Sequence, residues 1–149
     1  MSTAFVTGKS STLSIATSGT GTPTYTVVNQ IKTTNYSGTK LDTDDITNMT
    51  SPGAFREYAP TLNDAGQLAI SGVFDPADPG QLMFSAAFNA QTLISVKHQF
   101  PVAQGQTTGF LRTFVGYVTE NTLDLQFDKA STFNATIKIT GPITDTPGS

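Results

Sequence analysis

Side chains that could carry out chemistry are few in this chain of 149 residues, which has one histidine and no cysteine. The absence of cysteine excludes thiolate catalysis, disulfides and cysteine-based metal sites. The histidine, His98, lies on the same predicted strand face as Ile94 and Val96, and no Gly-x-Ser-x-Gly nucleophile elbow occurs. This pattern favours a partly buried or interface histidine over a catalytic base. We therefore expect neither an enzyme nor a cofactor.

A possible phosphate-binding motif occurs near the N-terminus, where Gly8-Lys9-Ser10-Ser11 matches the end of a P-loop. The full motif requires glycine five residues before Gly8, but Thr3 stands there. The segment that follows reads as a strand, whereas a P-loop opens a helix. A turn before the first strand is the better interpretation.

An acidic segment, Asp42-Thr43-Asp44-Asp45, begins like a calcium-binding loop. An EF-hand would place glutamate eleven residues after Asp42, and Gly53 occupies that position. The segment is then a solvated acidic loop or an acidic patch that faces a neighbour, and the sequence leaves open whether an ion binds there.

A charged pair flanked by aromatic residues follows, with Arg56 and Glu57 between Phe55 and Tyr58. Such a pair contributes little as an isolated surface ion pair, but arginine and tyrosine are enriched at the centres of protein interfaces. We favour an interface. The residues expected there are Asp42, Asp44, Asp45, Met49, Phe55, Arg56, Glu57 and Tyr58.

The composition points to a β-rich protein with little charge. Charged residues make up 13% of the chain, about half the usual share, while threonine, asparagine and glycine are frequent. A surface with so few charges is either polar and uncharged or covered by neighbouring molecules. The net charge of −3 disfavours a nucleic-acid-binding protein. No secretory signal and no apolar run long enough to span a membrane is found, so synthesis in the cytoplasm and no membrane insertion are expected.

Hydrophobic alternation predicts a series of short strands. They cover residues 12–16, 25–33, 67–74, 92–100, 109–119, 122–127 and 133–139. A helix is predicted over Leu82–Ala90, because Asp78 has the character of an N-cap, Pro79 stands at the first helical position and Gln81 takes the capping-box position. The same segment partly alternates at Leu82, Phe84, Ala86 and Phe88, which is also compatible with a strand, but the cap favours the helix.

Loops are expected between these elements and at both ends of the chain. Residues 35–59 show no clean periodicity and are predicted to form a long loop between subunits. Flexible ends are predicted for residues 1–10 and 142–149, and Glu120-Asn121 is predicted to be a turn. The result is one domain over residues 1–149, mainly β, built as an antiparallel β-sandwich or barrel with one flanking α-helix.

Four segments carry a resemblance to a known family. They are Asp45–Thr47, Ser51–Tyr58, Leu62–Asp75 and Asp78–Gln81, in this order and spacing. In them the chain resembles the major tail tube proteins of long-tailed (siphovirus, lambda-type) bacteriophages, and the similarity extends from about Gly8 to Ile143.

This resemblance implies the tail-tube fold and a structural role. Family members form hexameric rings that stack into a tube, and inner strands of neighbouring subunits join into a barrel that lines the lumen. The implied partners are other copies of the chain and the tape-measure, tail-tip and tail-terminator proteins, while DNA passes through the lumen without specific binding. The implied location is the virion tail, assembled in the host cytoplasm.

An enzyme with a dispersed site, such as a small hydrolase, stays open as a rival, and His98→Ala would test it. Two further alternatives stand beside this interpretation. One is a monomeric β-sandwich binding module, similar to a lectin or an adhesin, that uses the threonine- and asparagine-rich loops. The absence of tryptophan and of a secretion signal weakens it. The other is a tube protein of a related particle, such as a gene transfer agent.

Overall fold

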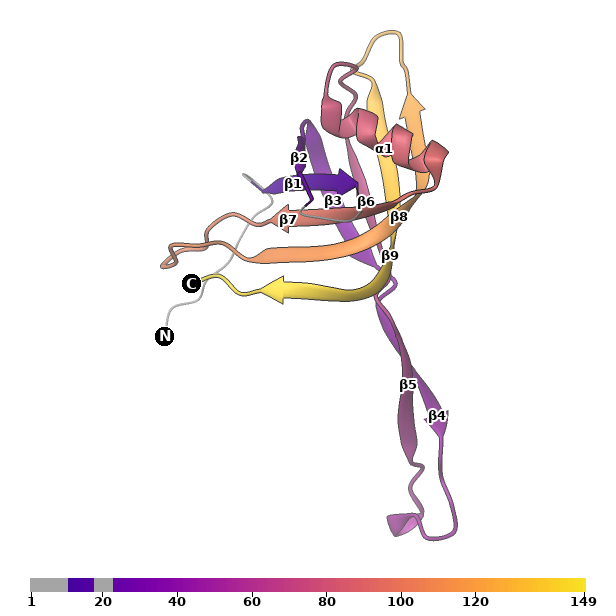
Figure 1. The fold of residues 1–149 in the computed structure, drawn as a ribbon. Helices are drawn as coiled ribbons and strands as arrows, with labels where there is room; N and C mark the ends of the chain where they lie inside the picture. The colour runs from indigo at the N-terminus through magenta and orange to yellow at the C-terminus, as the bar shows by residue number, and fades with distance from the viewer. Residues whose placement is uncertain (1–10, 18–22) are drawn as a thin grey trace.

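The computed structural model of the chain describes residues 11–17 and 23–149. The flexible N-terminal end predicted for residues 1–10 and the turn predicted around Lys9 lie outside the described residues. The described part contains one α-helix, one short 3-10 helix and a set of strands (Figure 1). The elements are β1 (Thr12–Thr17), β2 (Thr26–Val28), β3 (Ile31–Ser37), β4 (Lys40–Asp45), the 3-10 helix Pro52–Ala54, β5 (Tyr58–Asp64), β6 (Gln67–Val73), α1 (Pro79–Ala90), β7 (Leu93–Gln99), β8 (Leu111–Asp124) and β9 (Thr132–Thr146).

Seven of the strands form one antiparallel sheet in the order β2-β1-β7-β8-β9-β6-β3, and β4 pairs with β5 in a separate two-stranded sheet. The outermost strands of the large sheet, β2 and β3, follow each other in the chain and are separated by Asn29 and Gln30. Gln30 adopts a positive φ of 64°, and its carbonyl accepts a hydrogen bond from Val73 N at 2.9 Å. The sheet therefore curls until its two edges meet at this corner (Figure 1).

The long strands β8 and β9 divide the curled sheet into two halves. The first part of β8, Leu111–Tyr117, pairs with β7, whereas the first part of β9, Thr132–Lys138, pairs with β6. Register irregularities between Thr113 and Val115 and between Val118 and Glu120 accompany the bend of these strands. The outer sides of the second half of β8 and of the second half of β9 are consequently free of a strand partner within the described chain.

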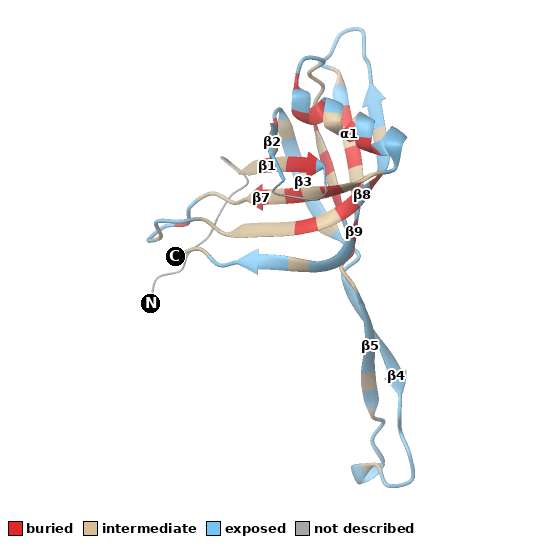
Figure 2. Cartoon of the chain, in the orientation of Figure 1, coloured by how far each residue is buried: buried red, intermediate tan, exposed pale blue. Residues whose placement is uncertain are grey.

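The core lies inside the curl, where the inward faces of the strands meet one another and α1 covers part of them (Figure 2). Alternation along β6, β7 and β9 places every second side chain in it, as the sequence predicted. Phe84 of α1 is fully buried and contacts Phe133 of β9 with 5.7 Å between ring centroids. The buried apolar set is Leu13, Ile15, Val28, Leu68, Ile70, Phe84, Ala87, Ile94, Val96, Phe114, Val118, Phe133, Ala135, Ile137 and Ile139.

The predicted helix is confirmed and begins slightly earlier, at Pro79. Asp78 caps it, since its carboxylate accepts a hydrogen bond from Gln81 N at 3.3 Å. The predicted capping box is wrong, however. The Gln81 side chain instead donates to the carbonyls of Asn29 and Val73, both at 3.0 Å, and accepts from Asp75 N at 3.0 Å. It ties the helix to the corner where the sheet edges meet.

Other predictions about the elements need correction. The strand predicted over 25–33 is split at Gln30 into β2 and β3, and the turn predicted at Glu120-Asn121 does not form because β8 continues to Asp124. The C-terminal end predicted to be unpaired is largely strand. β9 runs to Thr146 along β8, and Ser149 N donates to Thr108 O at 3.2 Å. The mainly β, antiparallel fold with one flanking helix is confirmed.

Candidate assembly surface

A long β-hairpin leaves the body of the protein between β3 and β6 (Figure 1). We call residues 39–65 the arm. Its two strands pair from Lys40–Asp64 to Asp45–Tyr58, so the long loop predicted for residues 35–59 is a hairpin for most of its length. No residue from 37 to 65 is buried, and all of β4 is exposed (Figure 2). Because neither face of the hairpin meets the core, hydrophobic alternation was absent from its sequence.

Polar bonds between side chain and backbone order the tip of the arm. Asp45 Oδ1 accepts from Thr47 N at 2.9 Å, and Glu57 N donates to Thr47 Oγ1 at 2.8 Å. Ser51 Oγ donates to the Glu57 carboxylate at 3.0 Å. The hydrogen bonds of Thr47 lower the pKa of the Asp45 carboxyl. The tip therefore has a defined shape although it lies far from the core.

The predicted interface residues all lie on this arm. Asp42, Asp44 and Asp45 belong to β4, whereas the others lie at the tip or at the start of β5. Arg56 approaches Asp45 at 3.9 Å, and its neighbour Glu57 is engaged by Ser51. The apolar side chains are strongly exposed, with Met49 at 104%, Phe55 at 76% and Tyr58 at 56%. The structure thus gathers these residues on one projection, and their contact with another subunit stays a prediction.

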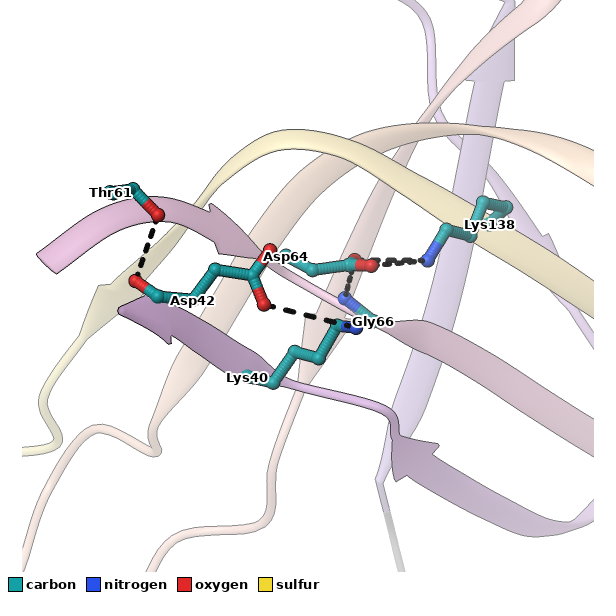
Figure 3. A network of polar contacts seen from close by, with 6 residues as sticks. All are labelled: Lys40, Asp42, Thr61, Asp64, Gly66 and Lys138. Atoms are coloured by element: carbon teal, nitrogen blue, oxygen red, sulfur yellow. Dashed lines mark hydrogen bonds and ion pairs between the residues drawn. The ribbon is translucent and has the colours of Figure 1, made fainter. Parts of the chain in front are cut away.

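A second polar network fixes the base of the arm to the body (Figure 3). Lys138 of β9 donates to both oxygens of Asp64, at 2.9 and 3.2 Å, and Gly66 N donates to Asp64 Oδ1 at 2.8 Å. The Gly66 bond and then Lys138 lower the pKa of the Asp64 carboxyl. Lys40 lies 4.0 Å from Asp42, whose backbone carbonyl accepts from Thr61 Oγ1 at 3.0 Å.

This base was not predicted from the sequence. The sequence feature that could have indicated it is the pair of glycines that flank the arm, Gly38 and Gly66, with φ of 79° and 85°. A Cβ at Gly66 would lie 2.2 Å from Ser37 O, so only glycine fits where the chain returns to the body. Glycines at both ends of an otherwise polar segment mark where a projection begins and ends.

His98 belongs to a different site, a cluster that joins the two halves of the sheet. The side chain is 3% exposed, and the Tyr36 hydroxyl lies 2.9 Å from its Nδ1. The Arg112 guanidinium lies 4.6 Å from the Tyr36 ring centroid and pairs with Asp145 at 2.8 Å. Burial raises the pKa of Tyr36 to about 12. Burial and then the charge of Arg112 lower the pKa of His98, so the histidine that was predicted to be partly buried or at an interface is buried and neutral near pH 7.

This burial predicts a pH-dependent stability. The pKa of His98 is lower in the folded protein than the ordinary 6.5, so the unfolded chain binds a proton that the folded chain does not. The free energy of unfolding should decrease as the pH falls through about 6.5. Urea unfolding between pH 7.5 and 5.5, at concentrations too low for assembly, measures it. In His98→Gln this decrease should be smaller, and equal decreases in both proteins would contradict the assignment.

In residues 11–17 and 23–149 no group of three or more histidine or acidic side chains could hold a metal ion, the Asp42–Asp45 segment included. In the same ranges no helix is both long and apolar enough to cross a bilayer. The candidate site described above is a set of surfaces: the arm, its base and the open strand edges.

Comparison with solved structures shows which known fold this chain has. The chain matches the SPP1 tail tube, determined by solid-state NMR and cryo-EM, with a TM-score of 0.70 and 12% identity over 97% of this chain and 80% of that one. It has the tail-tube fold. Sequence comparison adds nothing, since neither a protein-family model nor a curated protein matches.

Two further matches of the tail-tube fold come from other kinds of particle. A chain of the anti-feeding prophage baseplate, solved with 6-fold symmetry, matches with a TM-score of 0.72 and 11% identity over 99% of this chain and 98% of that one. A chain from the tail of an empty gene transfer agent particle, refined with C6 symmetry, matches at 0.61 and 18% identity over 90% and 95%. At these identities the likeness concerns the fold alone.

Proposed function

We propose that this protein is a structural, non-enzymatic subunit that assembles into hexameric rings stacked into the tail tube of a long-tailed bacteriophage. The observation that carries the proposal is the arm. A two-stranded hairpin is marginally stable by itself in water, yet this one keeps a defined register with no buried residue along its length. Such an element gains its stability when a second molecule covers it.

The open strand edges support the same function. Within residues 11–17 and 23–149, the outer sides of the second halves of β8 and β9 have no strand partner, and open strand edges invite pairing with another chain. A contact between different patches of identical subunits generates a closed ring when its rotation fits, and otherwise a filament. The symmetry of the matched particles favours six copies in such a ring.

The assembled tube would serve as the conduit for the genome. With a net charge of −3 per copy, a ring would repel DNA weakly and let it slide without specific binding. Tape-measure, tail-tip and tail-terminator proteins are the further partners in this proposal, and the virion tail is its location. The match to a gene transfer agent tail supports the related alternative, a tube subunit of that kind of particle.

Electron microscopy of the purified, concentrated protein tests the proposal. Rings and tubes of uniform diameter are the expected result, because both the arm and the strand edges need a second copy. Light scattering over a concentration series provides the control. A species that stays at 15.7 kDa at every concentration would exclude a tube-forming subunit and would revive the monomeric binding module.

A further inference from the structure

The strand that leads into the arm, β3, is hydrogen-bonded to the body on one side only. It lies at an edge of the large sheet, where it pairs with β6, and it continues into the arm (Figure 1). Its other side borders a cavity of about 670 Å³, which is lined by Lys32, Thr33, Thr34 and His98 among other residues. In the described part of the chain no strand pairs with β3 across this cavity. Side-chain contacts therefore hold the free side of the strand.

Tyr36 provides the contact that lies nearest to the arm. Its hydroxyl is 2.9 Å from Nδ1 of His98, and the two rings stack with 5.9 Å between their centroids. The same ring meets Phe114 of β8 edge-to-face, with 6.0 Å between centroids. Only Ser37 and Gly38 separate Tyr36 from the arm, and Gly38 adopts a positive φ of 79°. Tyr36 thus fixes the end of β3 to β7 and β8 directly before the chain turns into the arm.

The surroundings of His98 offer no compensation for a positive charge on its ring. The polar groups near it are the hydroxyl of Tyr36 and the ammonium of Lys32 from β3, the guanidinium of Arg112 from β8 and the carboxylate of Asp145 from β9, while Leu13 of β1 and Phe100 are apolar neighbours. Asp145 is already paired with Arg112 at 2.8 Å. A proton added to His98 therefore places an unbalanced cation in a buried site, which is costly.

We propose that His98 and Tyr36 form an acid-sensitive contact, which we call the latch, that holds the first strand of the arm to the body. At neutral pH the latch is closed, and the Tyr36 hydroxyl donates to Nδ1 of the neutral imidazole. When His98 takes up a proton from solvent, Nδ1 can no longer accept from Tyr36, and the charged ring is more stable in water. The end of β3 and the start of the arm then open more often while the rest of the sheet stays folded. The latch is a property of the single subunit and goes beyond the proposed assembly.

Proton linkage gives the direction and the size of the effect. Burial lowers the pKa of His98 below its ordinary 6.5 in the closed state, whereas the released imidazole returns to about 6.5. The open state therefore binds the additional proton as the pH falls below about 6.5, and the closed state loses stability over this range. Between pH 7.5 and pH 5.0 the equilibrium constant for opening should rise by at most about 30-fold, the limit for one group with this pKa.

Hydrogen exchange tests the latch, measured by mass spectrometry on the wild-type protein at concentrations too low for assembly. The protection of the β3 amides is compared with that of the amides of residues 133–139 in β9, after correction for the intrinsic exchange rate at each pH. At pH 7.5 we expect β3 to be at least about tenfold less protected than β9, because the latch opens without global unfolding. At pH 5.0 the protection of β3 should fall by a further factor of about 10 to 30.

Two variants identify the groups that form the latch. In His98→Gln the fall in β3 protection between pH 7.5 and pH 5.0 should disappear, because glutamine does not titrate. Tyr36→Phe keeps the ring but loses the hydroxyl, so at pH 7.5 β3 should open about 2- to 10-fold more often than in the wild type. The matched control is Tyr117→Phe. Tyr117 lies on β8, is 46% exposed, and should leave the exchange of β3 unchanged.

Contrary results are equally defined. Equal protection of β3 and β9 at pH 7.5 would mean that the contact opens only when the whole protein unfolds, and would overturn the latch. Protection of β3 that does not change with pH in the wild type, or that falls equally in His98→Gln, would show that His98 does not control the opening. Where His98→Gln fails to fold, Tyr36→Phe decides, and unchanged exchange of β3 in that variant would contradict the proposal.

Discussion

Replacement of residues 38–66 by Asn-Gly should abolish tube growth completely while the body of the protein still folds. The change removes the arm and its base but keeps β3 and β6. Ser37 and Gln67 are directly paired in the antiparallel register of these strands, so two residues suffice to connect them. Asn-Gly is the preferred sequence for such a connection, because it adopts the type I′ turn that suits the twist of a hairpin.

The body should tolerate this change because the arm contributes no buried side chain to the core, and only the partly buried Ala65 at its base packs against it. The buried apolar set lies entirely outside residues 38–66. The losses are at the surface: the pair between Lys138 and Asp64, and the hydrogen bond from Ile139 N to Gly66 O at 3.1 Å. An exposed ion pair contributes about 0–1 kcal/mol. We therefore expect a small decrease in the melting temperature and an unchanged circular dichroism spectrum.

Assembly should respond very differently, since the arm and its exposed apolar side chains disappear. Micrographs of the shortened protein should show single subunits or isolated rings, at concentrations where the wild type forms tubes. A second variant, Met49→Ser/Phe55→Ser, keeps the arm and removes only the exposed apolar side chains at its tip, so loss of tubes in this variant too would assign the effect to the tip. Tubes of normal length from the shortened protein would remove the arm from assembly and with it the main support for the proposed function.

The elements that were predicted correctly from the sequence are strands that bury one face and a helix that is capped by a near neighbour. The strands around Leu68 and Ile70 and around Phe133 and Ile137 were predicted because each buries one face, so apolar residues recur with a period of two. The helix was predicted from Asp78 and Pro79, since a cap is a local interaction between neighbours in sequence.

The missed features depend on contacts between distant segments. The arm was interpreted as a loop because its strands pair with each other and bury nothing. Gln81 was assigned to a local capping box, but its amide bonds to Asn29, which lies 52 residues away in the chain. Phe127 was included in the strand predicted over 122–127, whereas β8 ends at Asp124 and leaves this ring in solvent. Alternation alone cannot indicate where pairing stops.

The candidate site also contains residues that were predicted from the sequence and residues that were not. The interface residues from Asp42 to Tyr58 were predicted from unusual composition in an aperiodic segment, and the structure gathers them on one projection. Lys138 and Asp64 were not predicted as part of the site, because they meet at the base of the arm but are far apart in the sequence. The sequence of a short segment shows that its composition is unusual. Which residues of other strands it contacts depends on the register of the whole sheet.

The largest stability effect is expected at Asp78, where the helix and the sheet corner are joined. Its side chain is 2% exposed and accepts hydrogen bonds from Asn29 N at 3.0 Å, Asn29 Nδ2 at 2.9 Å and Gln81 N at 3.3 Å. Asp78→Ala removes the helix cap, which costs about 1 kcal/mol. It also removes the two hydrogen bonds from Asn29, an exposed residue whose donors can bond to water instead, at about 0.5–1.5 kcal/mol each. The expected total, about 2–4 kcal/mol, is a large part of a typical folding free energy of about 5–15 kcal/mol.

The same turn supplies a matched control, Asp75→Ala. Asp75 is half-buried and caps only the short Asp-Pro-Ala turn, where its Oδ1 accepts from Ala77 N at 3.0 Å. Its replacement should cost about 1 kcal/mol, the usual net contribution of one hydrogen bond. Asp78→Asn keeps an acceptor oxygen and should lie between the two alanine variants. Urea unfolding followed by circular dichroism orders the three, and equal losses at Asp75 and Asp78 would mean that the helix cap does not hold the corner where the sheet closes.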